Sequence, residues 1–136
     1  MKAEIHWDLG FILHPFVFWC AMNRSLSLRA GADFQRVWDE GKSLALPLVV
    51  LRVRANGMTT CRFAFVAGKK IGNAVVRNRV KRRLREAVRQ RLATLTPGWD
   101  IIVIARGNAE SASWHEINDA IQTLFQRARL ISLETV

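Results

Sequence analysis

The sequence predicts an α+β fold, a single two-layer α/β sandwich domain in which helices pack against one sheet. Residues 74–92 and 111–130 each repeat apolar residues at helical spacing, and a shorter helical pattern precedes the first strand. Three apolar runs have the length and composition of strands, namely residues 46–54, 59–67 and 99–106. With an optional extra strand near residues 43–46, the predicted order is α-β-β-(β)-α-β-α.

The first helix is predicted within GADFQRVWDEG, residues 31–41. Phe34, Val37 and Trp38 lie at positions i, i+3 and i+4, so they share one helix face. Gly41 is suited to end the helix. The run LPLVVLRVR that follows is typical of a strand, rich in Val and Leu, with apolar and basic residues alternating at its end.

Asn56 and Gly57 predict a hairpin turn after this strand, because both central positions of such a turn accept positive φ. The next run, TTCRFAFVA, would then be the partner strand of the hairpin. Cys61, Phe63 and Phe65 point to one side of it, and we interpret the two phenylalanines as core residues.

A basic helix follows a loop in which Gly68 and Gly72 bracket Lys69 and Lys70. Within residues 74–92 an apolar residue recurs at every fourth position, which predicts a helix with one buried face and one exposed basic face. The apolar stripe consists of Val76, Val80, Leu84, Val88 and Leu92, and it is widened by Ala87.

The last two predicted elements are a buried strand and an amphipathic helix. WDIIVIAR follows a break at residues 96–98 and is a continuous apolar run, typical of a strand covered on both faces. In residues 111–130, Ser113 and Glu116 have the spacing of a capping box. The apolar stripe of this helix consists of Ile117, Ile121, Leu124 and Ala128.

Residues 1–24 form an atypical apolar extension before the domain predicted for residues 25–136. Its segment GFILHPFVFWCAM is too short to span a bilayer and makes a poor signal peptide. Three interpretations stay open: a loosely packed or disordered extension, a start-site artefact with Met22 as the beginning, and a transient contact with a membrane or partner. No stable membrane association is expected.

The positive charge of the chain is concentrated in one segment. The net charge is +10, and residues 69–91 contain ten basic residues opposed only by Glu86. A polyanion partner is therefore indicated, and the excess of arginine, whose planar fork matches phosphate, favours nucleic acid over membrane. A docked helix holds its cations rigidly, and Asn73 and Asn78 can bond phosphate or a 2′-hydroxyl, so a folded RNA suits it.

Two other interpretations of the basic helix carry less weight. The first is a solvated charged helix, but such a helix usually mixes both signs of charge and this one hardly does. The second is a nuclear-localisation signal, but such a signal would not need the apolar stripe. Lys81, Arg85 and Arg89 follow each other at i, i+4 spacing, where like charges repel. We therefore expect phosphate or sulfate to stabilise the folded protein.

No catalytic constellation is apparent. The GKK sequence lacks the spacing of a phosphate-binding P-loop, and the serines lack a nearby base. Cys20 and Cys61 lack metal-ligand spacing and are expected to be buried or incidental thiols, in keeping with a reducing cytoplasm. The acidic residues nearest the core elements, Asp33, Asp39, Glu40 and Asp100, do not cluster, so no metal site is expected.

The segments around the basic helix resemble the protein subunit of bacterial ribonuclease P. The family's signature runs through KKIGNAVVRNRVKRRLRE, residues 69–86, with RNR at residues 77–79. DFQRVWDEGKS, RFAFVAGKK and WDIIVIAR stand around it as the family has them, and the resemblance covers about residues 26–130. Before Phe34 the chain is less basic than the family usually is, and LALPL replaces a more polar stretch.

This resemblance implies one sheet with flanking helices and a left-handed crossover through the RNR helix, an exception to the usual handedness. It also implies that the protein binds a catalytic RNA and the 5′ leader of precursor tRNA, assisting endonucleolytic removal of the leader. The hydrolysis would belong to the RNA and its magnesium ions, with no cofactor bound by the protein alone. The expected location is the cytoplasm.

The same resemblance assigns residues to two surfaces. Phe34 and Trp38 are expected to line a central cleft for the single-stranded leader, and Arg52 takes a strand position where relatives can present an aromatic. For Phe34 and Trp38, core packing is the alternative to base stacking. The residues expected to bind RNA are Lys69, Lys70, Asn73, Arg77, Asn78, Arg79, Lys81, Arg82, Arg85 and Arg89.

Two other functions compete with this one. A structural RNA-binding protein of ribosomal type would share the basic helix, but the RNR block between GKKIGNAV and WDIIVIAR favours the ribonuclease P subunit. A protein-only nuclease would need clustered acidic metal ligands. The sequence leaves the oligomeric state and the class of catalytic RNA open.

Overall fold

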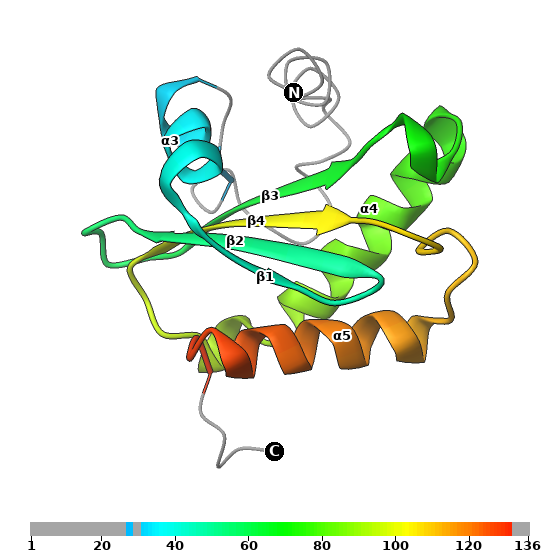
Figure 1. Cartoon of the computed structure of the whole chain (residues 1–136). Coiled ribbons are helices and arrows are strands. Elements are labelled where there is room, and N and C mark those ends of the chain that lie inside the picture. The colour runs from blue at the N-terminus through cyan, green and yellow to red at the C-terminus, as the bar shows by residue number, and fades with distance from the viewer. Residues whose placement is uncertain (1–26, 29–30, 132–136) are drawn as a thin grey trace.

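The computed structural model describes residues 27–28 and 31–131, which form one sheet and the helices that cover it (Figure 1). The predicted extension and the start at Met22 lie outside the described residues. The order of elements confirms the α+β class and the optional strand. In chain order they are α3 (Ala32–Glu40), β1 (Lys42–Ala45), β2 (Val49–Ala55), β3 (Arg62–Ala67), a 3-10 turn (Lys69–Ile71), α4 (Ala74–Arg89), a second 3-10 turn (Leu92–Thr94), β4 (Trp99–Ala105) and α5 (Trp114–Arg127).

β4 lies inside the sheet, between β2 and β3. The strand order is β1-β2-β4-β3, with β4 antiparallel to β2 and parallel to β3. Val103, in the middle of β4, lies opposite Leu51 of β2 and Phe65 of β3. This central place explains the continuous apolar run of β4, because a strand flanked by neighbours and covered on both faces has few polar surroundings.

The predicted hairpin between β2 and β3 is wrong, because these strands are not neighbours. The turn itself forms: Gly57 has a φ of 69°, and the Asn56 side-chain oxygen accepts a hydrogen bond from the Met58 N–H at 2.8 Å. After the turn the chain reaches the far edge of the sheet, while β2 forms its hairpin with β1. The Asn56–Gly57 turn predicted β3 as the neighbour of β2. β4 occupies that position instead, because residues 101–105 are apolar on both faces and suit the middle of the sheet.

α4 and α5 cover one face of the sheet and α3 lies on the other (Figure 1). The larger core lies beneath α4 and α5 and includes Val80, Leu84 and Val88 of the predicted stripe. Phe63 and Phe65 are buried in it, so their interpretation as core residues is confirmed. The sheet with α4 and α5 is the predicted two-layer sandwich, and α3 adds a partial layer on the opposite face.

α4 joins two parallel neighbouring strands, β3 and β4. The Lys69–Ile71 turn and the start of α4 therefore follow the carboxyl end of β3, beside the carboxyl end of β4. The N-cap is Asn73, whose side chain accepts the Val76 N–H at 3.0 Å. The predicted capping box of Ser113 and Glu116 is present at α5. The left-handed path of the crossover stays a prediction.

Candidate nucleic-acid interface

The exposed side of α4 carries part of the predicted cationic face. Arg79 and Arg82 lie three residues apart on one side of the helix and are exposed, as are Lys69 and Lys70 before its start. Arg77 and Asn78 are half-buried. We call Lys69, Lys70, Arg79 and Arg82 the open basic surface.

Two residues of the predicted RNA-binding set do not lie on that face. Lys81 is 1% exposed and Arg85 is 5% exposed, and the Arg85 guanidinium carbon lies 5.9 Å from the centre of the Phe65 ring. Both positions directly follow stripe residues, so their long aliphatic stems pack at the border of the buried face. Lys81 and Arg85 therefore add no exposed charge to the open basic surface in this structure. That they contact RNA stays a prediction.

Three other arginines of the segment bond groups of the protein itself. Arg83 donates to the Ala112 carbonyl at 2.9 Å, and the Arg89 Nε donates to the Glu86 carboxylate at 3.0 Å. This pair lowers the pKa of Glu86 and raises the pKa of Arg89. The third arginine, Arg91, bridges α4 and α5.

Arg91 donates to the Ala87 carbonyl at 2.7 Å within its own segment. Across the helix pair it donates to Gln122 Oε1 at 2.7 Å and to Asn118 Oδ1 at 2.8 Å. Burial lowers the pKa of this guanidinium, which nevertheless stays charged because arginine starts so high. Much of the charge counted in the sequence therefore stabilises the fold, and a smaller part remains for a partner.

Among the described residues, Lys70, Arg79 and Arg82 are the cations of the basic segment whose side chains make no hydrogen bond or ion pair. They lie on the open basic surface, where charge repulsion goes unopposed by the protein itself. Asn73 uses its side-chain oxygen as the cap of α4, which leaves its amide N–H groups for a ligand. This arrangement of cations and N–H donors is suited to bind an anion.

A pocket of about 410 Å³ adjoins the open basic surface, and we call it the cleft pocket. Trp38 from α3 and Val66 and Ile104 from the sheet supply apolar wall, while Lys69 and Lys70 supply charge. An aromatic face beside lysines suits an unpaired nucleotide, whose base stacks and whose phosphate pairs with the cation. The complete lining is Trp38, Val66, Gly68, Lys69, Lys70, Ile71, Ile104, Ala105, Arg106 and Gly107.

The three residues predicted for the cleft have different positions. Trp38 lines the pocket and is half-buried, whereas Phe34 is fully buried under α3 in the smaller core. The expectation that Phe34 lines the cleft is thus corrected in favour of core packing, because its ring faces the sheet. Arg52 lies beside the pocket: its guanidinium carbon is 5.7 Å from the Trp38 ring centre, and Nη2 donates to the Gly41 carbonyl at 3.3 Å.

Arg106 was not predicted as a site residue, yet it lines the cleft pocket. It follows Ile102 and Ile104 at strand spacing, so it extends the sheet face that α3 partly covers. The parallel register pairs Ala67 with Ala105, which brings Arg106 next to the segment that starts the basic loop. The sequence offered only its place at the end of an apolar strand, and this became informative once the structure showed which face of the sheet borders the pocket.

A buried ion pair within the sheet extends to α3 through a half-exposed one. Arg62 of β3 donates to both oxygens of Asp100 of β4, at 2.8 and 2.7 Å, and to Asp33 of α3 at 3.1 Å. Asn56 also donates to Asp100, at 2.9 Å. The hydrogen bond to Asp100 is the main cause of the raised pKa of Arg62. Trp38 is therefore carried on a helix that ion pairs fasten to the sheet.

Two of the four acidic candidates, Asp33 and Asp100, are engaged by Arg62. The described ranges contain no group of three or more metal-binding side chains, and no helix in them is long and apolar enough to cross a bilayer. Cys61 is a buried free thiol.

Comparisons with known proteins agree with this picture. A family model described as Ribonuclease P matches residues 22–129. The ribonuclease P protein component of Herpetosiphon aurantiacus is 41% identical over 109 residues, which cover 80% of this chain and 89% of the relative. That of Symbiobacterium thermophilum is 40% identical over 114 residues, covering 83% of this chain and 99% of the relative.

Solved structures show the same likeness. The ribonuclease P protein of Staphylococcus aureus matches with a TM-score of 0.72 at 30% identity, covering 79% of this chain and 98% of that chain. The protein from Thermotoga maritima matches with a TM-score of 0.68 at 32% identity, covering 74% and 96%. The matched residues 22–129 include the whole sheet and all of α3, α4 and α5.

Proposed function

The chain belongs to the bacterial ribonuclease P protein family and is a protein subunit of that ribonucleoprotein, and from this premise we propose how its surfaces divide the work. The open basic surface binds the ribonuclease P RNA, and the cleft pocket takes the 5′ leader of precursor tRNA. As a subunit of an endoribonuclease that processes tRNA 5′ ends, the chain assists removal of the leader.

One observation carries this proposal: Lys69 and Lys70 belong to both places at once. They precede the start of α4 on the open basic surface, and they line the cleft pocket with Trp38. A single-stranded RNA leader that leaves the active site of the catalytic RNA can therefore reach the cleft pocket without crossing uncharged surface. The protein increases substrate affinity by adding contacts to the leader, which mature tRNA lacks.

We assign the hydrolysis to the RNA and its magnesium ions. Supporting this, the described part of the chain offers no clustered metal ligands, and Asp33 and Asp100 are engaged by Arg62. The protein then binds no cofactor alone, and magnesium enters with the RNA. We propose that the protein acts in the cytoplasm on precursor tRNA and forms no stable association with a membrane.

Cleavage of precursor tRNA at low magnesium tests the function directly, using a bacterial ribonuclease P RNA with and without the protein. We expect cleavage to be stimulated by the protein and to require the RNA. RNA binding without stimulation, by an RNA shown to be active at high magnesium, would favour the structural RNA-binding alternative. Cleavage by the protein alone would contradict the assignment of chemistry to the RNA.

The open basic surface is tested by replacing Arg79 and Arg82 together with glutamine. For each phosphate that the variant no longer neutralises, the slope of log K against log salt should fall by about 0.7 to 0.9. The matched control is Arg83→Gln with Arg127→Gln, which removes the same charge from a structural contact and from the exposed side of α5. Equal salt slopes for both double variants would show that charge alone, rather than this surface, binds the RNA.

A further inference from the structure

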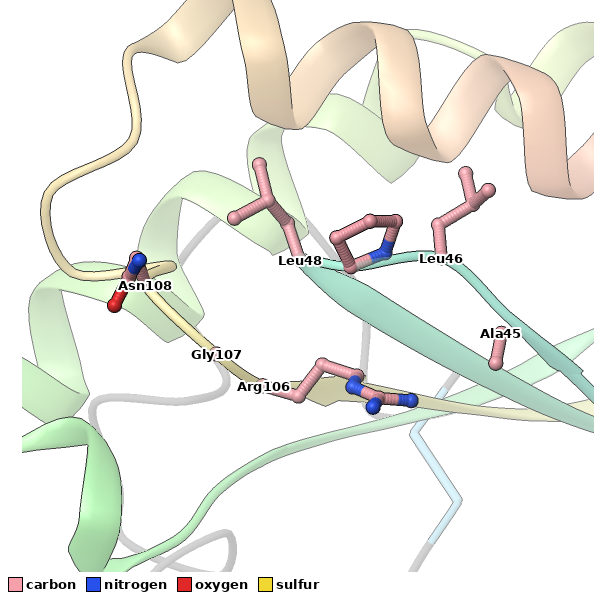
Figure 2. A pocket seen from close by; sticks show the side chains of 7 residues that line it. Ala45, Leu46, Leu48, Arg106, Gly107 and Asn108 are labelled. Carbon is pink, nitrogen blue, oxygen red and sulfur yellow. The ribbon is translucent and has the colours of Figure 1, made fainter.

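A second pocket lies beside the cleft pocket, at the turn between β1 and β2 (Figure 2). We call it the turn pocket, and its volume is about 620 Å³. Leu46 and Leu48 point from the turn toward α5. The exposed side chains of the lining include Pro47, Arg106 and Asn108. Its lining consists of Ala45, Leu46, Pro47, Leu48, Arg106, Gly107 and Asn108.

Arg106 belongs to both pockets and has no partner of its own. Its exposed side chain makes no hydrogen bond or ion pair with any residue of the described ranges. By contrast, Arg52 and Arg54 on the neighbouring strand bond Gly41 and Glu40. A cation kept unpaired where two hollows meet is suited to an anionic ligand that passes between them.

Backbone donors adjoin this cation. Within the described chain, the N–H groups of Gly107 and Asn108 donate no hydrogen bond, and Gly107 has a φ of 60°. Consecutive free N–H groups around a residue with positive φ form a concavity that binds anions. Figure 2 shows the Arg106 guanidinium extended toward Ala45 and away from Asn108, so the cation and these N–H donors border the turn pocket from two sides.

The loop that carries these donors is held in place by the β1–β2 turn. The Arg106 N–H donates to the Leu48 carbonyl at 3.0 Å. A Cβ added to Gly107 would lie 2.6 Å from the Pro47 carbonyl oxygen, so only glycine allows the two segments to approach this closely. The turn pocket is thus preformed, and a ligand need not order the loop in order to bind.

We propose that the turn pocket binds a phosphate of single-stranded RNA and continues the leader path beyond the cleft pocket. The inference rests on the proposed function, since the leader has to occupy the cleft pocket first. Arg106 joins the two binding sites, and Gly107 and Asn108 complete the second one. On the far side of the turn, Glu116 and Asp119 line another hollow and repel phosphate, so the path ends at the turn pocket.

The test measures how affinity depends on leader length. The holoenzyme is assembled from the full chain and a ribonuclease P RNA, and dissociation constants are measured for mature tRNA and for precursors with leaders of up to about 16 nucleotides. Affinity should rise in two steps as the leader fills first the cleft pocket and then the turn pocket. Asn108→Asp, which adds a carboxylate to the turn pocket only, should remove the second step and leave the first.

The loss expected for the longer leaders is roughly tenfold, comparable to one hydrogen bond to a charged group. Ala45→Glu, in the exposed edge strand, is a second variant of the same kind. Arg127→Gln is the control, because it changes the net charge equally on the exposed side of α5. Arg106→Gln should lower both steps.

The outcomes separate this inference from the proposed function. If the wild-type protein shows leader dependence but both acidic variants retain the second step, the turn pocket is not a leader site and only this inference fails. Equal losses for every substrate, mature tRNA included, would also overturn it. If the wild-type protein gives no leader dependence at all, the proposed leader cleft fails and the inference fails with it.

Discussion

Replacing Asp100 with alanine should destabilise the protein strongly. The carboxylate is 3% exposed and accepts three hydrogen bonds, two from Arg62 and one from Asn56. Removing one member of a buried ion pair costs about 3 to 5 kcal/mol. The low end applies, because Arg62 is partly exposed and keeps its contact with Asp33 at 3.1 Å. A loss of about 3 kcal/mol corresponds to a fall in Tm of roughly 10 to 20 °C.

The assay is urea denaturation followed by circular dichroism, with thermal melts as a second measurement. Asp100→Asn keeps the shape and one acceptor, so its loss in free energy of unfolding should be smaller. The control is Asp33→Asn, which removes a half-exposed partner of the same arginine and should cost no more than about 1 kcal/mol. An Asp100→Ala protein within about 0.5 kcal/mol of wild type, or equal costs at both positions, would refute the reasoning.

Sulfate or phosphate should raise the Tm, because either anion binds native cations that have no partner in the protein; an equal rise with chloride at matched ionic strength would contradict specific binding. Arg52→Ala should weaken leader-dependent affinity more than Arg54→Ala, since Arg52 stacks on Trp38 whereas Arg54 pairs with Glu40; equal losses would mean that both act only by holding α3. Burial raises the pKa of the Cys61 thiol, so at pH 8, below that pKa, it should stay protonated. In a Cys20→Ser background, iodoacetamide should label it at least about tenfold more slowly in the native protein than in urea, and equal rates would disprove its burial.

The helices and the central strand could be predicted because their signals are local. Four-residue apolar spacing marks the buried face of α4, and Ser113 with Glu116 caps α5 as expected. β4 was recognisable as a buried strand because its residues 101–105 form an unbroken apolar run. Each of these patterns reports which side of a segment meets water, and this needs no knowledge of its neighbour.

Strand pairing was predicted wrongly where a local turn signal competed with packing between residues far apart in the chain. The Asn56–Gly57 turn forms, but β4 pairs with β2 in the place that the turn assigned to β3. Hydrogen bonding along a strand edge is the same for any partner, so the choice depends on which arrangement buries the most apolar surface. That choice involves residues far apart in the chain, such as Leu51 and Val103.

Some properties of the site could be read from the sequence, and others depend on the folded structure. The fold class, the concentration of charge in one segment and the anionic nature of the partner follow from composition and spacing, which are properties of the chain alone. Which of these cations are exposed depends on how the elements pack. Packing buries Lys81 and Arg85, ties Arg91 to α5 and brings Arg106 into the same pocket lining as Lys70, because the direction of a long side chain is set by the surface against which its element docks.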